Sequence, residues 1–146
     1  MSNFPPESFF IFDLDDTLYK EIDFVKSGYF EIAVKLSSGT NQNLIYNAML
    51  STYKQGGNAI QAGINLSENT LYTCSDLIHT YRLHIPHISL DFDTKHLLKV
   101  LINSGYKLGL ITDGRSNTQR NKLNSLGIEH IFSEIIISEE FGSEKP

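Results

Sequence analysis

Three short apolar runs constrain, more than any other feature, what this chain of 146 residues can fold into. They lie at Phe9–Phe12, Lys107–Thr112 and Glu134–Ser138. Uninterrupted runs of this length favour parallel strands that are covered on both faces of a sheet. Helical patterns precede the second run and separate it from the third. This order predicts an α/β fold with a parallel sheet and right-handed crossover connections.

The two helices of this region have recognisable ends. Asp91 or Asp93 can cap the first helix, which should end near Ser104. Ser116 or Asn117 can cap the second, which should stop at the next glycine.

A long segment without a convincing strand separates the first apolar run from these helices. Residues 19–90 are too many for a connecting loop, and helical windows occur at 24–36, 44–53 and 67–83. We therefore predict an α/β core formed by residues 1–18 and 91–146, and a helical insert formed by residues 19–90.

Composition excludes several classes of protein. Twelve Lys and Arg against 17 Asp and Glu give a net charge of −5, and there is no long basic run. Because binding to nucleic acid or to an anionic membrane surface depends on basic groups, neither is expected. The single cysteine, Cys74, excludes an internal disulfide and a multi-cysteine zinc site. The sequence has no long apolar stretch and no basic N-terminal segment, so we expect neither a membrane span nor a signal peptide but a cytoplasmic protein.

A group of acids directly after the first apolar run carries the chemistry. Asp13, Asp15 and Asp16 follow Phe12, where mutual repulsion and desolvation make such a concentration of charge costly. Two acids two residues apart on an extended backbone can point toward one substrate. One can act as a nucleophile and the other as a proton donor and acceptor, with a cation holding both near an anionic substrate.

Two plainer interpretations compete with this one. A calcium-binding loop beginning at Asp13 would need Gly at its sixth position and Glu at its twelfth, where this chain has Leu18 and Phe24. A helix N-cap at Asp15 or Asp16 is the structural alternative, but it does not account for the whole cluster.

The segment Asp13-Leu14-Asp15-Asp16-Thr17 resembles the first motif of the haloacid dehalogenase-like hydrolase superfamily, Asp-x-Asp-x-Thr after a hydrophobic strand. The resemblance implies a Rossmann-like core, with Asp13 as the nucleophile that forms an aspartyl-phosphate and Asp15 as the general acid and base. It also implies a Mg²⁺ ion bound by the Asp13 side chain and the Asp15 backbone carbonyl. Because the dehalogenases of this superfamily lack an acid at the position of Asp15, the resemblance favours a phosphatase or a phosphomutase.

Two further segments resemble later motifs of the same superfamily. Residues 110–116 combine a strand end, a glycine turn and a helix start, a pattern that favours anion binding. Their resemblance to the second motif implies phosphate binding by the Thr112 hydroxyl and by the backbone N–H groups of Asp113 and Gly114. The last five residues resemble the third motif, Gly-x-x-Lys-Pro, whose lysine, here Lys145, offsets the charge of nucleophile and phosphate.

The same resemblance makes the helical insert the family's cap, a lid that covers the site and selects the substrate. Residues 119–127 and 131–132 also resemble the capped branch of the family. We interpret the nearby histidines His79, His84 and His87 as packing or surface residues rather than metal ligands.

The resemblance stops short of a complete site. The family's fourth motif, an acidic pair that completes the magnesium site, has no counterpart in this sequence. The sheet would be incomplete, with three core strands, and the first strand would be an exposed edge. We expect the chain to be part of a longer protein of roughly 220 residues or more. The alternatives are a natural short product that associates with itself through its first strand, and a non-catalytic relative.

The sequence thus predicts a Mg²⁺-dependent phosphohydrolase that moves a phosphoryl group from a small phosphorylated metabolite to Asp13 and then to water. Asp15 protonates the leaving oxygen, while Thr112 and Lys145 stabilise phosphoryl charge. A phosphomutase of the same superfamily and a non-catalytic interaction domain are the rival functions. For these 146 residues alone, we expect weak turnover or none.

Overall fold

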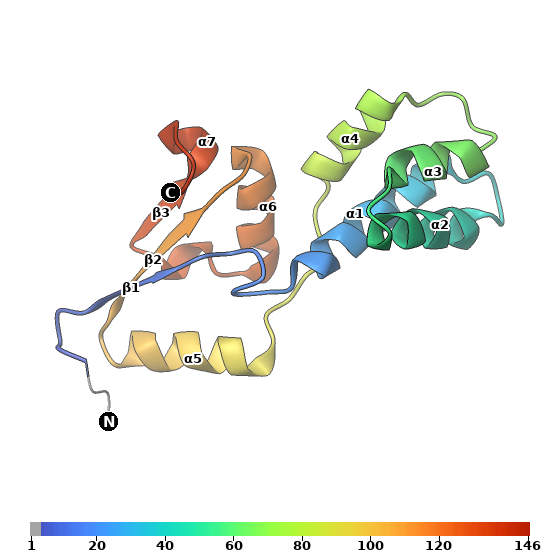
Figure 1. Ribbon diagram of the computed structural model, residues 1–146. Coiled ribbons are helices and arrows are strands. Elements are labelled where there is room, and N and C mark those ends of the chain that lie inside the picture. Colours follow the sequence, from blue (N-terminus) through green and yellow to red (C-terminus); the bar gives the residue numbers. More distant parts are fainter. Residues whose placement is uncertain (1–3) are drawn as a thin grey trace. The chain divides into compact units, whose positions relative to one another are not determined.

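The computed structural model describes residues 4–146, and their contacts divide them into two compact units (Figure 1). The α/β unit comprises the residues up to Asp23 together with His87–Pro146, and the helical unit comprises Phe24–Pro86. The strands are β1 (Phe9–Phe12), β2 (Lys107–Thr112) and β3 (Glu134–Ile137). The helices are α1 (Glu21–Leu36), α2 (Gln42–Lys54), α3 (Ala59–Leu66), α4 (Cys74–Leu83), α5 (Phe92–Asn103), α6 (Ser116–Leu126), the short 3₁₀ helix η1 (Glu129–Ile131) and α7 (Ser138–Phe141).

The strands of the α/β unit form a parallel sheet in the order β1-β2-β3, which confirms the predicted fold class. Phe12 at the end of β1 pairs with Leu110, and Thr112 at the end of β2 pairs with Ile137. Because the strands are parallel, their carboxyl ends meet at one edge of the sheet. The residues that follow β1, β2 and β3 are therefore brought together there.

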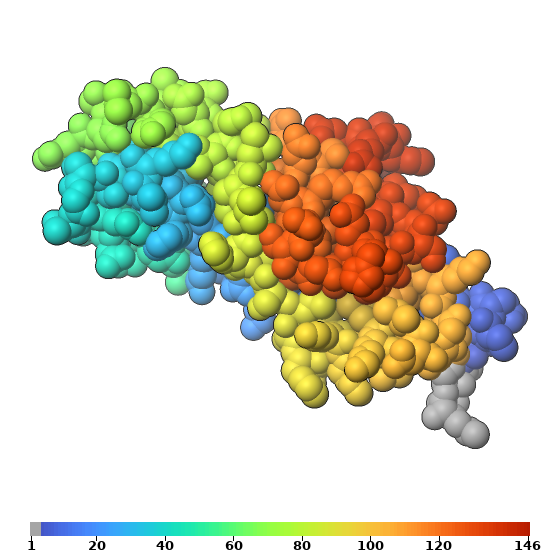
Figure 2. Space-filling view, turned by 180° about the vertical axis from the view of Figure 1, so that it is seen from behind, coloured from blue at the N-terminus to red at the C-terminus, as the bar shows by residue number. Residues whose placement is uncertain are grey.

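The two faces of the sheet are covered unequally. Right-handed connections from β1 to β2 and from β2 to β3 place α5 and α6 on the same face. Leu108, Leu110 and Ile137 on that face are buried, and from behind, the yellow α5 and the orange segments around α6 form most of the surface of this unit (Figure 2). On the opposite face, Ile11 is 61% exposed. The expected cover on both faces is thus found on one face only among residues 4–146.

The helices next to β2 begin for different reasons. Asp91 caps α5, because its Oδ1 accepts a hydrogen bond from the Thr94 backbone N–H at 2.7 Å. The predicted cap of α6 by Ser116 or Asn117 is wrong, since Ser116 is the first residue of the helix. Its N–H instead donates to Glu139 at 2.7 Å, an acceptor that lies 23 residues further along the chain.

The helical unit differs from the prediction at its third helix. The window 67–83 is wrong for its first part, because α4 begins only at Cys74, behind a capping box made by Thr73 and Asp76. The preceding helix, α3, was not predicted. Its cap is Asn58, whose side chain accepts a hydrogen bond from the Gln61 backbone N–H at 3.1 Å. Gly56 and Gly57 lie between the C-cap of α2 at Gln55 and the N-cap of α3 at Asn58.

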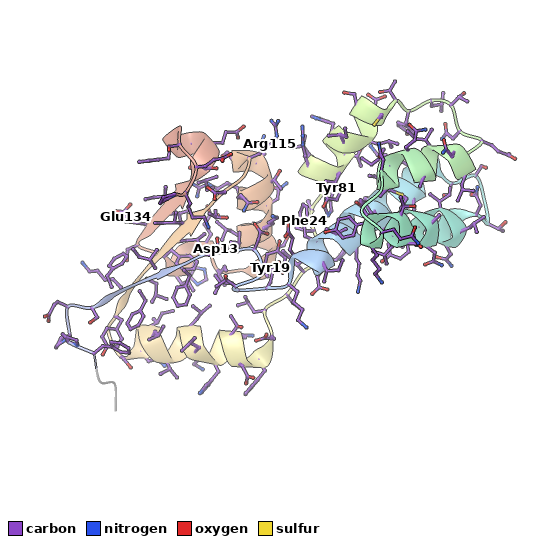
Figure 3. The ribbon with its side chains drawn as sticks, in the orientation of Figure 1. Asp13, Tyr19, Phe24, Tyr81, Arg115 and Glu134 are labelled. Carbon is purple, nitrogen blue, oxygen red and sulfur yellow. The ribbon has the colours of Figure 1, made fainter. Side chains whose placement is uncertain are left out.

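Close packing holds α1 against α4 in the helical unit. A Cβ atom on Gly28 would lie only 2.4 Å from the Tyr81 ring, so these helices approach at a position without a side chain. Phe24 contacts the rings of Tyr81 and His84, and Figure 3 shows Phe24 and Tyr81 together in this unit. His84 is buried, and its Nε2 lies 3.0 Å from the Ser27 hydroxyl. It is a packing residue, as predicted.

None of the helices within residues 4–146 has both the length and the apolar character needed to cross a bilayer.

Candidate active site

Asp13 lies immediately after β1 at the carboxyl edge of the sheet (Figure 3). Its Oδ1 accepts a hydrogen bond from Lys145 Nζ at 2.5 Å, and its Oδ2 accepts one from the Thr17 hydroxyl at 3.3 Å. The Asp13 side chain is 38% exposed. A carboxylate in this position is anchored by a cation and is still accessible to a ligand.

The chain turns directly after Asp13 rather than continuing as a strand. The Leu18 N–H donates to the Leu14 carbonyl at 3.0 Å, and Asp16 adopts a positive φ of 56°. Asp16 Oδ1 accepts from the Glu21 backbone N–H at 2.9 Å, at the first residue of α1. Asp16 is therefore not the N-cap residue of α1, but its side chain accepts the first N–H of that helix. Asp15 has other partners.

Asp15 is held by donors from α6 and from the segment that precedes α1. Its Oδ1 accepts hydrogen bonds from Lys122 Nζ at 2.7 Å and from the Tyr19 hydroxyl, and its Oδ2 accepts from Gln119 Nε2 at 3.0 Å. The Lys122 side chain is 6% exposed, so this is a buried ammonium beside a mostly buried carboxylate. Gln119 Nε2 also donates to the Thr112 hydroxyl at 2.7 Å, which connects Asp15 to the end of β2.

The surroundings of Asp15 and Glu21 shift the pKa values of these two acids in opposite directions. Burial raises the pKa of Asp15, but the Lys122 ammonium lowers it by its charge and its hydrogen bond. Tyr19 and Gln119 lower it further, so the pKa of Asp15 lies below its ordinary value and the group is a carboxylate at neutral pH. Glu21 follows the acid cluster, where burial and then the charge of Asp15 raise its pKa.

The residues after β2 face the same edge of the sheet. Thr112 is 1% exposed, with its hydroxyl bound to Gln119. The Asp113 carboxylate accepts a hydrogen bond from the Lys145 backbone N–H at 2.9 Å. The Gly114 N–H donates to the Ser138 hydroxyl at 2.9 Å. The structure therefore brings Thr112 and Asp113 beside Lys145, while the Gly114 N–H is engaged by the segment that follows β3.

The segment after β3 is tied to α6 by acids that the sequence left unexplained. Glu139 accepts from the Ser116 N–H, and Glu140 accepts from the Ser116 hydroxyl at 2.5 Å. Arg120 on α6 donates to both oxygens of Glu140, at 3.1 and 2.9 Å. These bonds anchor α7 at the start of α6, and α7 leads directly into the segment that carries Lys145.

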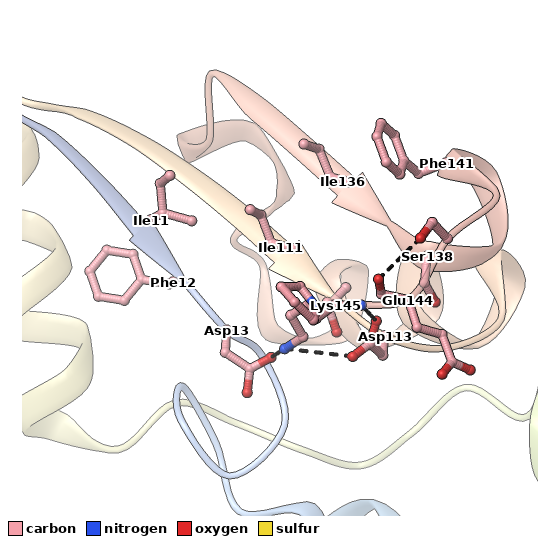
Figure 4. A pocket seen from close by; sticks show the side chains of 13 residues that line it. Ile11, Phe12, Asp13, Ile111, Asp113, Ile136, Ser138, Phe141, Glu144 and Lys145 are labelled. Atoms are coloured by element: carbon pink, nitrogen blue, oxygen red, sulfur yellow. Dashed lines mark hydrogen bonds and ion pairs between the residues drawn. The ribbon is translucent and has the colours of Figure 1, made fainter.

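A cavity of about 510 Å³ opens at this edge of the sheet (Figure 4). The charged residues that line it are Asp13, Asp113, Glu144 and Lys145, and Figure 4 shows Lys145 directed at the carboxylates of Asp13 and Asp113. Apolar side chains form much of the remainder: Ile11, Ile111 and Ile136 lie on the open face of the sheet, and Phe141 is the last residue of α7. The apolar part belongs largely to the face of the sheet that no described element covers, and the charged end is the part suited to an anion.

Sequence reasoning assigned no role to the residues that hold Asp15. Gln119, Lys122, Leu123 and Leu126 are the buried residues of α6, and they follow the i, i+3, i+4, i+7 spacing of one helix face. Burying a lysine and a glutamine on such a helix face is unfavourable unless both have buried hydrogen-bond partners. That conflict was visible in the sequence and could have marked Lys122.

The oxygen donors at the end of β1 determine which metal ion this site could hold. The described part of the chain has no group of three or more His, Cys, Asp and Glu side chains able to hold a metal ion. Mg²⁺ usually keeps several waters and takes one or two carboxylates together with substrate phosphate oxygens. The Asp13 carboxylate and the Asp15 backbone carbonyl fit such an ion, and they do not fit a metal enclosed by protein ligands alone.

The fold and the charged strand ends define a class of protein. The family model described as haloacid dehalogenase-like hydrolase matches residues 10–146, and the chain belongs to this family. A glyceraldehyde 3-phosphate phosphatase of Methanocaldococcus jannaschii is 36% identical over 151 residues, which cover 93% of this chain and 64% of the relative. A protein of the same name from Methanothermobacter thermautotrophicus is 28% identical, with 92% and 64% covered. The chain thus spans about 64% of the length of these relatives.

Solved structures share the fold. The Bacillus subtilis protein YfnB, described as a HAD-hydrolase and solved bound to magnesium, has a TM-score of 0.63 at 22% identity, with 96% of this chain and 67% of that chain covered. The L-2-haloacid dehalogenase of Xanthobacter autotrophicus has a TM-score of 0.53 at 13% identity, with 96% and 60% covered. At these identities the likeness concerns the fold alone.

Proposed function

We propose that this protein is a phosphatase that transfers a phosphoryl group from a small phosphomonoester to Asp13 and then to water. The observation that carries the proposal is the Asp13 carboxylate at the mouth of the cavity, bound by Lys145 and flanked by Asp113. A nucleophile beside a fixed cation suits attack on a phosphate, because the cation offsets the charge that gathers there.

The first half of the reaction uses Asp13 and Asp15. An Asp13 carboxylate oxygen forms a bond to phosphorus while the bond from phosphorus to the ester oxygen breaks. The departing alkoxide takes a proton from the Asp15 carboxylic acid. The pKa of Asp15 is low in the ligand-free protein, and the negative charge of a bound phosphate raises the pKa of neighbouring carboxylates, which is the direction this step requires.

The second half restores the protein. A water molecule attacks the phosphorus of the aspartyl-phosphate, and the Asp15 carboxylate accepts the proton that this water loses. The bond between phosphorus and the Asp13 oxygen breaks, which releases inorganic phosphate. Lys145, the Thr112 hydroxyl and the Asp113 N–H are the donors proposed to bind the phosphoryl oxygens. Gly114 can join them only if Ser138 releases its N–H.

Mg²⁺ is the proposed cofactor, held by the Asp13 carboxylate and the Asp15 backbone carbonyl. When bound, it supplies positive charge that neutralises the phosphate and helps to orient it. The magnesium-bound neighbour of the same fold supports this choice of ion.

The proposed substrate is glyceraldehyde 3-phosphate or a similarly small phosphomonoester. Two relatives that cover more than nine-tenths of this chain carry the name glyceraldehyde 3-phosphate phosphatase. Lys145 at the charged end of the cavity suits the phosphate group of such an ester. We propose that the helical unit acts as the cap that selects this substrate, with residues 19–90 as the insert. Self-association through β1 stays a prediction.

The test is phosphate release by the complete gene product in the presence of Mg²⁺. Asp13→Asn keeps the shape of the side chain but removes its nucleophilic charge, so release from glyceraldehyde 3-phosphate should fall about a thousandfold or more. Asp93→Asn, at an exposed acid in the first turn of α5, is the matched control and should release phosphate at the wild-type rate. Equal release by wild type and Asp13→Asn would contradict the proposal, and a phosphorylated isomer in place of free phosphate would indicate a mutase.

A further inference from the structure

We infer that Lys122 and Gln119 are positioning residues that orient the Asp15 carboxylate for proton transfer to the leaving group. The inference rests on the proposed phosphatase function and adds to it two residues of α6. Both residues contact the Asp15 carboxylate directly, and their proposed role is exerted through it.

The geometry fixes both oxygens of Asp15. Lys122 Nζ and the Tyr19 hydroxyl contact Oδ1, and Gln119 Nε2 contacts Oδ2. A carboxylate bonded at one oxygen can still rotate, whereas one bonded at both is held in a single plane. Proton transfer requires such control, since a misplacement of about 1 Å can cost about a hundredfold in rate.

The choice of residue at position 122 supports a functional role. Lys122 lies in the buried stripe of α6, next to Leu123. An apolar side chain of similar volume would avoid the desolvation of an ammonium there, and replacing a buried ion pair by apolar residues is often neutral or stabilising. Packing alone therefore does not account for a lysine, whereas the orientation of Asp15 does.

Gln119 extends this control to the phosphate site. Its Nε2 donates to Asp15 at 3.0 Å and to the Thr112 hydroxyl at 2.7 Å. One amide thus sets the position of the proton carrier relative to a hydroxyl proposed to bind phosphate. Gln119 is 1% exposed, so its amide is shielded from solvent by the protein around it.

The test compares two esters that differ in their need for a proton. An alkyl phosphate such as glyceraldehyde 3-phosphate releases an alkoxide that must be protonated, whereas p-nitrophenyl phosphate releases a stable phenolate. The parameter to compare is kcat/KM, because it reports the steps up to the transfer of phosphate to Asp13 and not the later hydrolysis. A purely structural defect would lower both values alike.

Lys122→Met keeps the length of the side chain and removes its charge. It should lower kcat/KM for the alkyl ester about a hundredfold, and for the nitrophenyl ester less than about tenfold. Gln119→Leu should also lower kcat/KM more for the alkyl ester than for the nitrophenyl ester, but with a smaller difference between the two. Because it removes no buried charge, it keeps the proposal testable if Lys122→Met fails to fold. Lys99→Met, at an exposed lysine of α5, is the control and should leave both values unchanged.

A double-substitution cycle locates the effect at Asp15. In an Asp15→Asn background there is no acid to orient, so Lys122→Met should add no further preference between the esters. Equal losses on both esters in the single variants, or a preference that persists without Asp15, would overturn the positioning role while leaving the phosphatase intact. Wild-type release no greater than that of Asp13→Asn would overturn the phosphatase and the positioning role together.

Discussion

The α/β unit and the helical unit bury different kinds of groups. The α/β unit buries a lysine, a glutamine and a threonine around the acids that follow β1, and these are Lys122, Gln119 and Thr112. The helical unit buries mainly aromatic and aliphatic side chains, and its buried polar pair, Ser27 and His84, is bonded within the unit. Charge enters the interior where the strand ends converge, and the helical unit is held by packing and by helix caps.

This difference shows where each unit is sensitive. A buried ammonium is stable only while its carboxylate partner is present, so the α/β unit depends on a few exact pairings. A packed helical interface depends on shape, so it is damaged by added volume rather than by lost charge. Three substitutions test this contrast, beginning with the one of largest expected effect.

Asp15→Ala should be the most destabilising of the three. It leaves the Lys122 ammonium buried without its carboxylate, which should lower the free energy of unfolding by about 3 kcal/mol. Urea denaturation followed by circular dichroism measures the change. The double variant Asp15→Leu/Lys122→Met, which removes both charges, should regain most of the stability. A double variant as unstable as Asp15→Ala would show that the charge pair is not the cause.

Gly28→Ala tests the packing of the helical unit. The added Cβ would meet the Tyr81 ring at 2.4 Å, and we expect a loss of about 2 kcal/mol in the free energy of unfolding. Gly63→Ala on α3 is the matched control, because its nearest neighbour is the flexible thioether of Met49 at 2.9 Å. Its cost should be below about 1 kcal/mol, since a helical alanine is favoured over glycine. Equal costs at the two sites would contradict the proposed tight contact between α1 and α4.

Thr73→Ala should have the smallest effect, about 1 kcal/mol, through loss of the N-cap of α4. Its pH dependence is also predictable. Hydrogen bonds from the Thr73 backbone and hydroxyl lower the pKa of Asp76 below its ordinary value. A lowered pKa in the folded state stabilises the protein above the ordinary pKa and loses this effect as the pH falls through the lowered value. The stability difference between wild type and Thr73→Ala should therefore narrow on acidification below pH about 4. A constant difference would contradict the role of the Asp76 carboxylate.

Local patterns predicted most of the α/β unit. The three strands, the cap at Asp91 and the stop of α6 at Gly127 follow from residues adjacent in sequence, and the structure has them. The helices in the second half of the helical insert were harder to predict, because α3 is short and lies between a glycine pair and a polar turn. There the caps of α3 and α4, rather than the periodicity, determine the boundaries.

Two acids after β3 illustrate what local pattern could not supply. The sequence motifs assigned no role to Glu139 and Glu140. In the structure they bind Ser116 and Arg120, residues more than a dozen positions away. The partner of a charged loop residue cannot be inferred from its sequence neighbours, because the fold brings that partner from another element.

By itself the sequence determined the three strands of the α/β unit, its two longer helices and the acids that follow β1, since apolar runs, caps and turns act over a few residues. Only the tertiary structure decided what surrounds those acids. Asp15 and Lys122 are 107 residues apart in the chain and 2.7 Å apart in space. Such a pair forms because parallel strands gather their carboxyl ends at one edge, and the cost of burying an ammonium there is offset only by a carboxylate that arrives from a distant segment.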